Sequence, residues 1–275
     1  MNTPSLHRTV RIHATPQFDQ LEQGCNSHAG QPYSEGICTY FEFDVSCAGP
    51  CDPESGFVES IYSIDGAVRS LIVPRICQVM AQGEITPPRS LMPELFALVE
   101  EQLTSTLESL TWRLTPFYSI TRHRNSMDTV TLCRSYTFSS SHRLHNAEFG
   151  DAENERIYGK CSWPSGHGHN YIMEVSLEVP PHGTLEQCFG IDEIDSIVHE
   201  QVVDQFDHRY LNLDTESFKN TTPTLENITF ECHRLLQDHF NDERGRLRSV
   251  RVYETERTWC EFPSQGMLNE SRGRS

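Results

Sequence analysis

The sequence predicts an α+β fold in which helices cover one face of an antiparallel sheet. Apolar and polar residues alternate over 132–141, 167–179 and 247–259, which is the pattern of half-buried strands. Between the last two of these strands, apolar residues recur at helical spacing in two segments. The first half of the chain repeats this order weakly, which predicts two tandem copies of one unit.

In the second half, the strand over 132–141 comes first, and we expect the polar stretch 145–165 after it to be a loop. The strand over 167–179 ends at a Pro-Pro pair, which favours a turn. The first helix follows and is expected to end near Phe206.

The second helix is expected to begin at Thr222 and Pro223, because threonine is a favoured cap and proline is tolerated in the first turn. It should end near Gly245, and the last strand, 247–259, follows it. The residues around Phe262 leave room for a fourth strand.

The first half contains matching segments. Residues 40–45 correspond to the strand 167–179, Thr86 to the start of the second helix, and 112–120 to the last strand. Chance likeness of two α+β halves is the alternative to duplication. If the halves correspond, the first has other residues at the candidate functional positions of the second: Ile37 and Thr39 for His167 and His169, Ser90 for Glu226, and Ser119 for Glu254.

Composition narrows the class of protein. The formal net charge of −17 argues against nucleic acid or an anionic membrane surface as the main partner. No run of about 18 apolar residues is present, so no transmembrane helix is expected, and the amino-terminal residues lack the pattern of a signal peptide. The ten cysteines include no C-x-x-C pair, so free thiols or metal ligands are expected rather than disulfides. These properties predict a soluble, cytoplasmic protein.

Two histidines at the upstream end of the strand 167–179 are candidate metal ligands. His167 and His169 lie on its apolar face, because successive side chains of a strand point to opposite faces. His142, at the end of the preceding strand, could complete the three protein ligands of a catalytic zinc site. A turn with incidental histidines is the alternative, but His142 and Cys161 beside the pair favour the metal.

Five other residues are candidates for proton transfer or ligand binding. Cys161 lies among basic residues that favour its thiolate, although a small buried side chain is the commoner fate of a free cysteine. Asp207 and His208 follow a helix end, where a carboxylate could orient a titrating imidazole. Glu254 shares a strand face with apolar residues, so its charge needs a partner such as the N–H donors of a ligand; a frayed strand end is the alternative. Glu226, in the first turn of a helix, either contacts a ligand or complements the helix dipole.

Together these residues resemble those of one family, the 6-pyruvoyl-tetrahydropterin synthases and the related 6-carboxy-tetrahydropterin synthases of queuosine biosynthesis. The resemblance covers about residues 132–262. It rests on six motifs in the family's order: Phe138-Ser-Ser-Ser-His142-Arg-Leu, Tyr158-Gly-Lys-Cys161, Gly166-His-Gly-His169-Asn-Tyr171, Phe206-Asp-His208-Arg-Tyr-Leu-Asn212, Pro223-Thr-Leu-Glu226-Asn227 and Val252-Tyr-Glu254-Thr. The first half resembles the family only as a degraded copy.

The resemblance implies two tandem tunnelling-fold units, each an antiparallel four-stranded sheet with two helices packed on one face. Residues 132–262 would form the active pterin synthase-like domain, and residues 1–131 a degenerate copy without the zinc and catalytic residues. The polar stretch 263–275, which contains Gly and Ser, is expected from its composition to be a disordered tail. The roles it implies are zinc binding by His142, His167 and His169, proton abstraction by Cys161, an acid-base relay of Asp207 and His208, and a pterin anchor of Glu254 helped by Thr224 and Glu226.

The implied substrate is 7,8-dihydroneopterin triphosphate, which would lose triphosphate to give 6-pyruvoyl-tetrahydropterin. The five residues between Cys161 and His167 resemble members that form this product. A 6-carboxy-tetrahydropterin synthase is the alternative, and a non-catalytic module that binds zinc or pterin is another. The resemblance also implies a homo-oligomer with sites at subunit or domain interfaces. Arg143, Arg156 and Lys160 are the candidates for contacts with the triphosphate.

Overall fold

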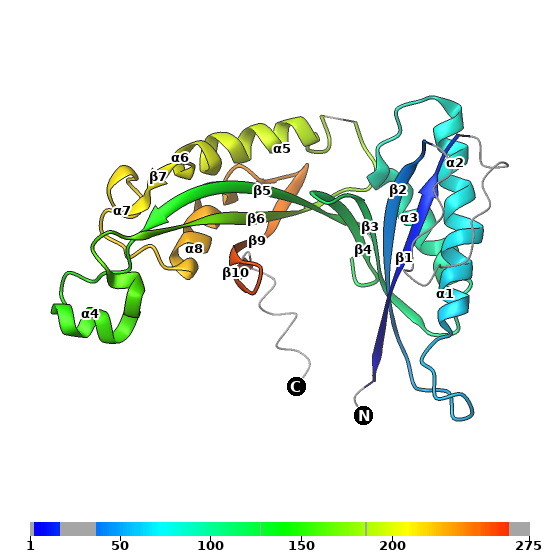
Figure 1. Cartoon of the computed structure of the whole chain (residues 1–275). Coiled ribbons are helices and arrows are strands. Elements are labelled where there is room, and N and C mark those ends of the chain that lie inside the picture. Colours follow the sequence, from blue (N-terminus) through cyan, green and yellow to red (C-terminus); the bar gives the residue numbers. More distant parts are fainter. Residues whose placement is uncertain (1–2, 17–36, 127, 185, 264–275) are drawn as a thin grey trace. The chain divides into compact units, whose positions relative to one another are not determined.

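The structure is a computed structural model that describes residues 3–16, 37–126, 128–184 and 186–263. The chain divides into two compact units, and each is described by itself. The first unit consists of Met1–Leu132 with Pro180–His182, and the second of Cys133–Val179 with Gly183–Ser275. Figure 1 labels their helices and strands.

The first unit contains a four-stranded antiparallel sheet with the strand order β1-β2-β3-β4. The strands are β1 (Ser5–Ala14), β2 (Thr39–Ala48), β3 (Thr106–Thr115) and β4 (Tyr118–His123). Two helical segments lie along one face of these strands, as Figure 1 shows. They are α1 (Ile61–Ala67) continued through a π-helical turn (Val68–Ile72) into α2 (Val73–Gln82), and α3 (Pro88–Glu100).

The core of the first unit lies between this sheet and its helices. Phe43 of β2 and Trp112 of β3 stack with ring centroids 5.4 Å apart. Leu95 and Phe96 of α3 are buried as well. Because alternate residues of a strand share a face, the buried residues of β2 and β3 form one apolar surface under the helices.

In the second unit the main strands follow in the order β5-β6-β9-β10. They are β5 (Val130–His142), β6 (His167–Val179), β9 (Gly245–Thr255) and β10 (Thr258–Pro263). Two short strands extend this sheet: β7 (Arg209–Tyr210) pairs in parallel with β5, and β8 (Asn241–Asp242) pairs with β9.

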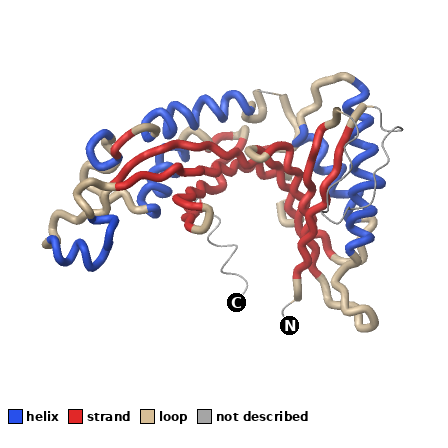
Figure 2. Tube along the Cα trace, viewed as in Figure 1, coloured by secondary structure: helices blue, strands red, loops and turns tan. Residues whose placement is uncertain are grey.

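The helices of the second unit include two main segments, as in the first. The first segment runs from α5 (Ile191–Val198) through a π-helical turn (His199–Val203) into α6 (Asp204–Phe206), and the second is α8 (Leu225–Gln237). Two further short helices are α4 (Asp151–Tyr158) and α7 (Leu211–Asp214). Figure 2 shows the same arrangement of helices against strands in both units. The predicted α+β fold, with two helices on a four-stranded antiparallel sheet in each unit, is confirmed.

The two units share irregularities at equivalent places, which determines how their residues correspond. The β2–β3 pairing shifts register after Ser46, and the β6–β9 pairing shifts after Ser176. The first helical segment of each unit also contains one π-helical turn. The last hairpin of each unit closes on the same pair of positions, Thr115 with Tyr118 and Thr255 with Thr258. A bulge is a local kink that disrupts a ladder, so its recurrence at one place supports a common origin of the units.

This correspondence corrects two of the matches made from sequence. Counted from the last hairpin, Leu114 rather than Ser119 is equivalent to Glu254, because Ser119 lies in β4, the counterpart of β10. The helices α3 and α8 have the same length, and their buried residues match only if Arg89 rather than Ser90 falls at the place of Glu226. Counted from the bulges, Thr39 does fall at the place of His169.

Three elements differ from the sequence prediction. The polar stretch 145–165 contains α4, whose residues form no apolar stripe that could have revealed it. The cap of α8 is Thr224 rather than Thr222. The predicted last strand, 247–259, ends earlier, at Thr255, and the fourth strand expected near Phe262 is β10, which follows after a tight turn.

Two further expectations concern the tail and membranes. Of the tail predicted over 263–275, Pro263 belongs to β10, and 264–275 lie outside the described residues. Among the helices that the structure describes, none has the length and apolar character needed to cross a bilayer.

Candidate metal centre

Three histidines of the second unit form a cluster suited to a metal ion. They are His142 at the end of β5, and His167 and His169 at the start of β6. One ring nitrogen from each lies within 4.8 Å of the others. The Nε2 atoms of His142 and His167 are 3.1 Å apart. The structure therefore brings the three predicted zinc ligands together, and imidazole nitrogen is a preferred ligand of zinc.

The pairing of β5 with β6 produces this cluster. Phe138 stacks on Tyr171 with ring centroids 5.0 Å apart, and Ser139 Oγ donates a hydrogen bond to Asn170 Oδ1. The two strands therefore run antiparallel, and the same register puts His142 opposite the start of β6.

Gly166 allows β6 to begin so close to β5. Its φ of 64° lies in the left-handed region, and a Cβ there would lie 2.8 Å from the carbonyl oxygen of His142. Glycine is the residue that tolerates both conditions. The glycine just before the first histidine is thus a structural requirement of the cluster.

His142 is held in the form that binds a metal. Its side chain is 1% exposed, and its Nδ1 lies 2.8 Å from the carbonyl oxygen of Pro223. A carbonyl can only accept, so Nδ1–H donates and Nε2 keeps its lone pair. Burial lowers the pKa of His142 to about 4, although the bond to Pro223 favours the charged form. The ring is therefore neutral near pH 7.

Glu254 of β9 lies beside two of the histidines. Its Oε1 is 3.3 Å from His169 Nε2 and 3.5 Å from His142 Nε2. The Glu254 side chain is 21% exposed, so the carboxylate borders the cluster without being sealed in. This position agrees with the strand-face argument made from sequence, since Val250 and Val252 on the same face are fully buried.

Two buried polar atoms near the cluster lack hydrogen bonds. Within the described residues, His169 Nε2 and Tyr171 Oη make none. Burial lowers the pKa of His169 and outweighs the Glu254 carboxylate, whose charge acts to raise it. Burial raises the pKa of Tyr171. A buried nitrogen without a hydrogen bond is costly, and a metal ion that takes its lone pair removes the cost. The residues present therefore fit a zinc ion. From the sequence, Tyr171 is only one of the apolar-face residues of the strand 167–179. Its hydroxyl group without a hydrogen bond is visible only in the fold.

Asp207 and His208 form a separate cluster at the edge of β5. The carboxylate accepts a hydrogen bond from the Ser139 backbone N–H at 2.7 Å through Oδ1, and its Oδ2 lies 2.7 Å from His208 Nδ1. The bond from Ser139 is the largest cause of the lowered pKa of Asp207. His208 has a φ of 57°, an uncommon conformation for a residue with a Cβ. The bonds of Asp207 and His208 to Ser139 hold it there.

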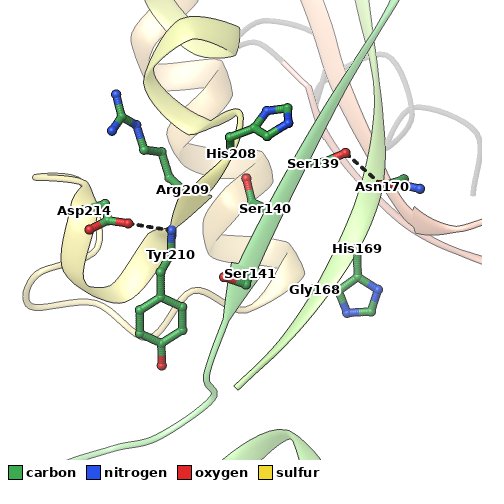
Figure 3. Close-up of a pocket in the computed structure, with 10 residues that line it drawn as sticks. All are labelled: Ser139, Ser140, Ser141, Gly168, His169, Asn170, His208, Arg209, Tyr210 and Asp214. Carbon is green, nitrogen blue, oxygen red and sulfur yellow. Dashed lines mark hydrogen bonds between the residues drawn. The ribbon is translucent and has the colours of Figure 1, made fainter. Parts of the chain in front are cut away.

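A pocket of about 580 Å³ lies beside this edge. It is lined by residues 139–141 of β5, 168–170 of β6 and 208–210, with Asp214. Figure 3 shows the imidazoles of His208 and His169 on opposite sides of the β5–β6 pair in this view. Within the described residues, no hydrogen bond or ion pair joins Asp207 or His208 to the three histidines. The His208 side chain is 84% exposed.

Cys161 is positioned by a short 3-10 turn (Gly159–Ser162) before β6. Its carbonyl accepts a hydrogen bond from the Leu144 N–H at 2.9 Å, which ties the turn to the end of β5. The thiol is half-buried and unoxidised, and it is not part of the histidine cluster. A half-buried thiol outside the histidine cluster can act as a base in proton transfer, and its partial exposure argues against a purely structural role in the core.

Thr224 is the N-cap of α8, and the Glu226 side chain is exposed. Thr224 Oγ1 caps α8 by accepting a hydrogen bond from the Asn227 N–H. Glu226 lies in the first turn of the same helix, as predicted. Neither the cap nor the exposed carboxylate identifies a ligand contact.

Two of the three basic residues proposed for the triphosphate are already engaged. Arg143 Nε donates to the Ser162 carbonyl at 2.7 Å, and Arg156 forms an exposed pair with Glu153. Lys160 lies in the turn that carries Cys161, and within the described residues no hydrogen bond or ion pair engages its side chain.

Comparison with known proteins places the second unit among pterin enzymes. A family model described as 6-pyruvoyl tetrahydropterin synthase matches residues 131–265. The 6-pyruvoyl tetrahydrobiopterin synthase of Dictyostelium discoideum is 36% identical over 134 residues, which cover 49% of this chain and 96% of the relative. The protein of that name from Homo sapiens is 33% identical over 127 residues, covering 45% of this chain and 83% of the relative.

The likeness to solved structures extends over both units. The crystal structure of uricase from Arthrobacter globiformis aligns with 97% of this chain and 95% of its own, with a TM-score of 0.50 and 8% identity. At this identity the likeness concerns the fold alone. It supports a tandem pair of tunnelling-fold units in one chain.

Proposed function

Because this chain belongs to the 6-pyruvoyl tetrahydropterin synthase family, we propose that its second unit is a zinc-dependent lyase acting on 7,8-dihydroneopterin triphosphate. The proposed products are 6-pyruvoyl-tetrahydropterin and triphosphate. The observation that carries the proposal is the cluster of three histidine nitrogens with the Glu254 carboxylate beside it. That combination would place a metal-binding site next to a carboxylate that can bind the pterin ring.

His142, His167 and His169 would hold the zinc ion through their ring nitrogens. Three neutral imidazoles would leave the ion's double charge uncompensated, and a zinc ion held there would supply a Lewis acid that favours deprotonation of the hydroxyl groups of the substrate side chain. The bond from His142 to Pro223 and the lowered pKa of His142 support this role, because a metal ligand must be deprotonated at the bonding nitrogen.

Glu254 would bind the pterin ring. A carboxylate can accept two N–H donors at once, and a pterin presents neighbouring N–H groups along one edge of its ring. The position of Glu254 next to His142 and His169 would then hold the pterin side chain at the metal. In the family resemblance Thr224 and Glu226 assist Glu254, and both lie at the start of α8, next to the Pro223 carbonyl that holds His142.

Cys161 would remove the proton from the substrate side chain. Loss of a proton next to the carbon that bears triphosphate allows the C–O bond to break, and triphosphate leaves with the bonding electrons. The conversion needs no external oxidant, because the pterin ring gains the hydrogen that the side chain loses. The half-buried thiol outside the metal cluster supports this assignment.

Asp207 and His208 would relay protons in a site completed by a second copy of the chain. In one copy the pair lies at the edge of β5 and His208 faces solvent. An acid-base pair needs to come within hydrogen-bond reach of its substrate. Within the described residues no hydrogen bond or ion pair joins this pair to the three histidines, and this supports a homo-oligomer with sites at its interfaces.

Loss of the thiol tests the proposal. Zinc-loaded Cys161→Ala should release triphosphate from 7,8-dihydroneopterin triphosphate at a small fraction of the wild-type rate while binding zinc normally. Cys260→Ala, at another half-buried free cysteine in the same unit, is the control and should keep the wild-type rate. Equal rates in the wild type and Cys161→Ala would remove Cys161 as the base. No triphosphate release by any form would instead favour a non-catalytic zinc or pterin module.

A further inference from the structure

Tyr171 of β6 lies across from Glu254 of β9. The antiparallel register of these two strands pairs Ile172 with Tyr253. One step further along, Tyr171 and Glu254 are therefore the opposed pair. Directly opposed residues of an antiparallel pair point to the same face, with Cβ atoms about 5 Å apart. That face carries the histidine cluster, because the ring centroids of Tyr171 and His169 are 5.6 Å apart.

The hydroxyl group of Tyr171 is buried without a hydrogen bond. The residue is 0% exposed, and within the described residues its Oη has no hydrogen-bond partner. The ring is held by stacking on Phe138, a contact that a phenylalanine would make equally well. A buried hydroxyl group without a hydrogen bond lowers stability, so its presence calls for an explanation. A partner that becomes available when the metal centre is occupied would provide one.

The Glu254 carboxylate needs a hydrogen-bond donor in that state. Its Oε1 lies 3.3 Å from His169 Nε2 and 3.5 Å from His142 Nε2. A zinc ion would take the lone pairs of these nitrogens, and a metal-bound ring nitrogen has no hydrogen to donate. Among the described residues, no other hydrogen bond or ion pair engages the carboxylate. The opposed Tyr171 hydroxyl is a donor on the same face, and the Glu254 charge follows burial among the causes that raise the pKa of Tyr171.

The first unit has neither member of this pair. There Phe41 of β2 lies opposite Leu114 of β3. By the shared bulges and hairpins, these two residues are the equivalents of Tyr171 and Glu254. The hydroxyl group and the carboxylate are thus both replaced by apolar side chains in the first unit, as expected if they act together. The same comparison shows that the fold accepts phenylalanine at the place of Tyr171.

We propose that Tyr171 is a positioning residue for Glu254: with the metal centre occupied, its hydroxyl group donates a hydrogen bond to the Glu254 carboxylate and orients it toward the pterin ring. This inference rests on the function proposed above, in which Glu254 binds the pterin. Tyr171 takes no part in the chemical step. It therefore affects how tightly the pterin binds rather than how fast triphosphate leaves.

Binding of 7,8-dihydroneopterin to the zinc-loaded full-length protein, measured by calorimetry, tests the proposal. Tyr171→Phe keeps the ring and removes the hydroxyl group, so it should weaken binding about tenfold, the effect of losing one hydrogen bond to a charged group. Zinc content should be unchanged, and in turnover KM should rise while kcat stays nearly constant. Tyr136→Phe is the matched control, because it removes another buried hydroxyl group of the same unit, one that donates to Asp195. It should bind the pterin as the wild type does.

The two proposals fail in different ways. Equal binding by the wild type and Tyr171→Phe overturns the role of Tyr171 alone. Absence of pterin binding by the wild type overturns the proposed function and this inference with it.

Denaturant unfolding with and without zinc gives a second test that needs no pterin. Tyr171→Phe should lower the unfolding midpoint of the zinc-loaded protein but not that of the metal-free protein, where the hydroxyl group has no hydrogen bond. Tyr136→Phe should lower both midpoints. In a Glu254→Leu background, Tyr171→Phe should no longer lower either midpoint, because the acceptor is gone. An equal fall with and without zinc in Tyr171→Phe, or a fall that persists in Glu254→Leu, overturns the proposal.

Discussion

The imidazole Nδ1 of His142 lies 2.8 Å from the carbonyl oxygen of Pro223, just before α8 begins. This contact links a proposed zinc ligand on β5 to the start of a helix that is 81 residues away in sequence. It selects the tautomer of His142 and orients its ring, as outer hydrogen bonds do for metal-bound histidines. The order of the α8 start and the affinity of the metal centre should therefore be coupled.

Thr224→Ala tests this coupling. The variant loses the hydroxyl that caps α8, which should lower the free energy of unfolding by about 1 kcal/mol. It should also weaken zinc binding, because the neighbouring Pro223 carbonyl is less well held. Competition with a chromophoric chelator measures the zinc affinity. Ser60→Ala removes the cap of α1 in the first unit and is the matched control. If both variants lose stability but bind zinc equally well, the coupling is absent.

His142→Ala tests the ligand set. The change removes one of three ring nitrogens, so zinc measured by mass spectrometry should fall from about one ion per chain to near zero after dialysis against a weak chelator. His145→Ala, three residues further on and outside the cluster, should retain the metal. Full retention of zinc by the His142 variant would exclude the three-histidine site.

Glu254→Gln tests the pterin anchor. The amide keeps the shape of the side chain but turns one acceptor into a donor, so it opposes a pterin N–H. We expect kcat/KM to fall on the order of 10- to 100-fold, the usual effect of losing hydrogen bonds to a charged group. Zinc content should be unchanged. Glu256→Gln, in the exposed turn after β9, is the control. A kcat/KM equal to that of the wild type would show that Glu254 does not bind the substrate.

The buried carboxyl group of Glu59 should make the free energy of unfolding of the first unit depend on pH. Burial raises the pKa of its carboxyl, but hydrogen bonds from Ser105, Ser60 and Thr104 outweigh burial and lower the pKa overall. A lowered pKa in the folded state means that the carboxylate stabilises the fold above the unfolded pKa. This contribution is lost as the pH falls through the folded pKa.

Glu59→Gln should therefore lower the free energy of unfolding by about 1–3 kcal/mol at pH 7, and the difference from the wild type should shrink as the solution becomes more acidic. Denaturant unfolding at several pH values measures this. Glu54→Gln, at an exposed site nearby, should match the wild type throughout. A difference that stays constant into the acid range would contradict the role of the charge.

The parts of the site that follow from strand geometry could be predicted from sequence. Side chains of a strand alternate between faces, so His167, His169 and Tyr171 had to share one face, and the structure shows them on it. Glu254 followed in the same way from Val250 and Val252. The order of residues alone determines which side chains share a face of a strand, and this explains why these expectations hold.

Other features depend on contacts between distant segments and could not be predicted. The bond from His142 to Pro223 joins two elements whose approach is decided by packing. The position of a hairpin turn leaves little signal in the sequence, so Ser119, which lies after the turn in β4, was matched to Glu254, which lies before the turn in β9. The helix α4 was missed because its exposed polar residues have no helical stripe.

The strand β1 was missed for a different reason. Val10, Ile12 and Ala14 alternate with polar residues and are fully buried, so the strand pattern was present. No candidate functional residue drew attention to that segment. From sequence, the first unit was described mainly by the absence of the metal and catalytic residues. A pocket between its sheet and its helices is visible only in the structure.

The central claim is that the second unit converts a pterin triphosphate at a zinc centre. The most direct measurement is incubation of the zinc-loaded full-length protein with 7,8-dihydroneopterin triphosphate, followed by separation and mass analysis of the products. We expect 6-pyruvoyl-tetrahydropterin and triphosphate, with turnover lost in His142→Ala. Formation of 6-carboxy-tetrahydropterin with acetaldehyde, or unchanged substrate, would contradict it.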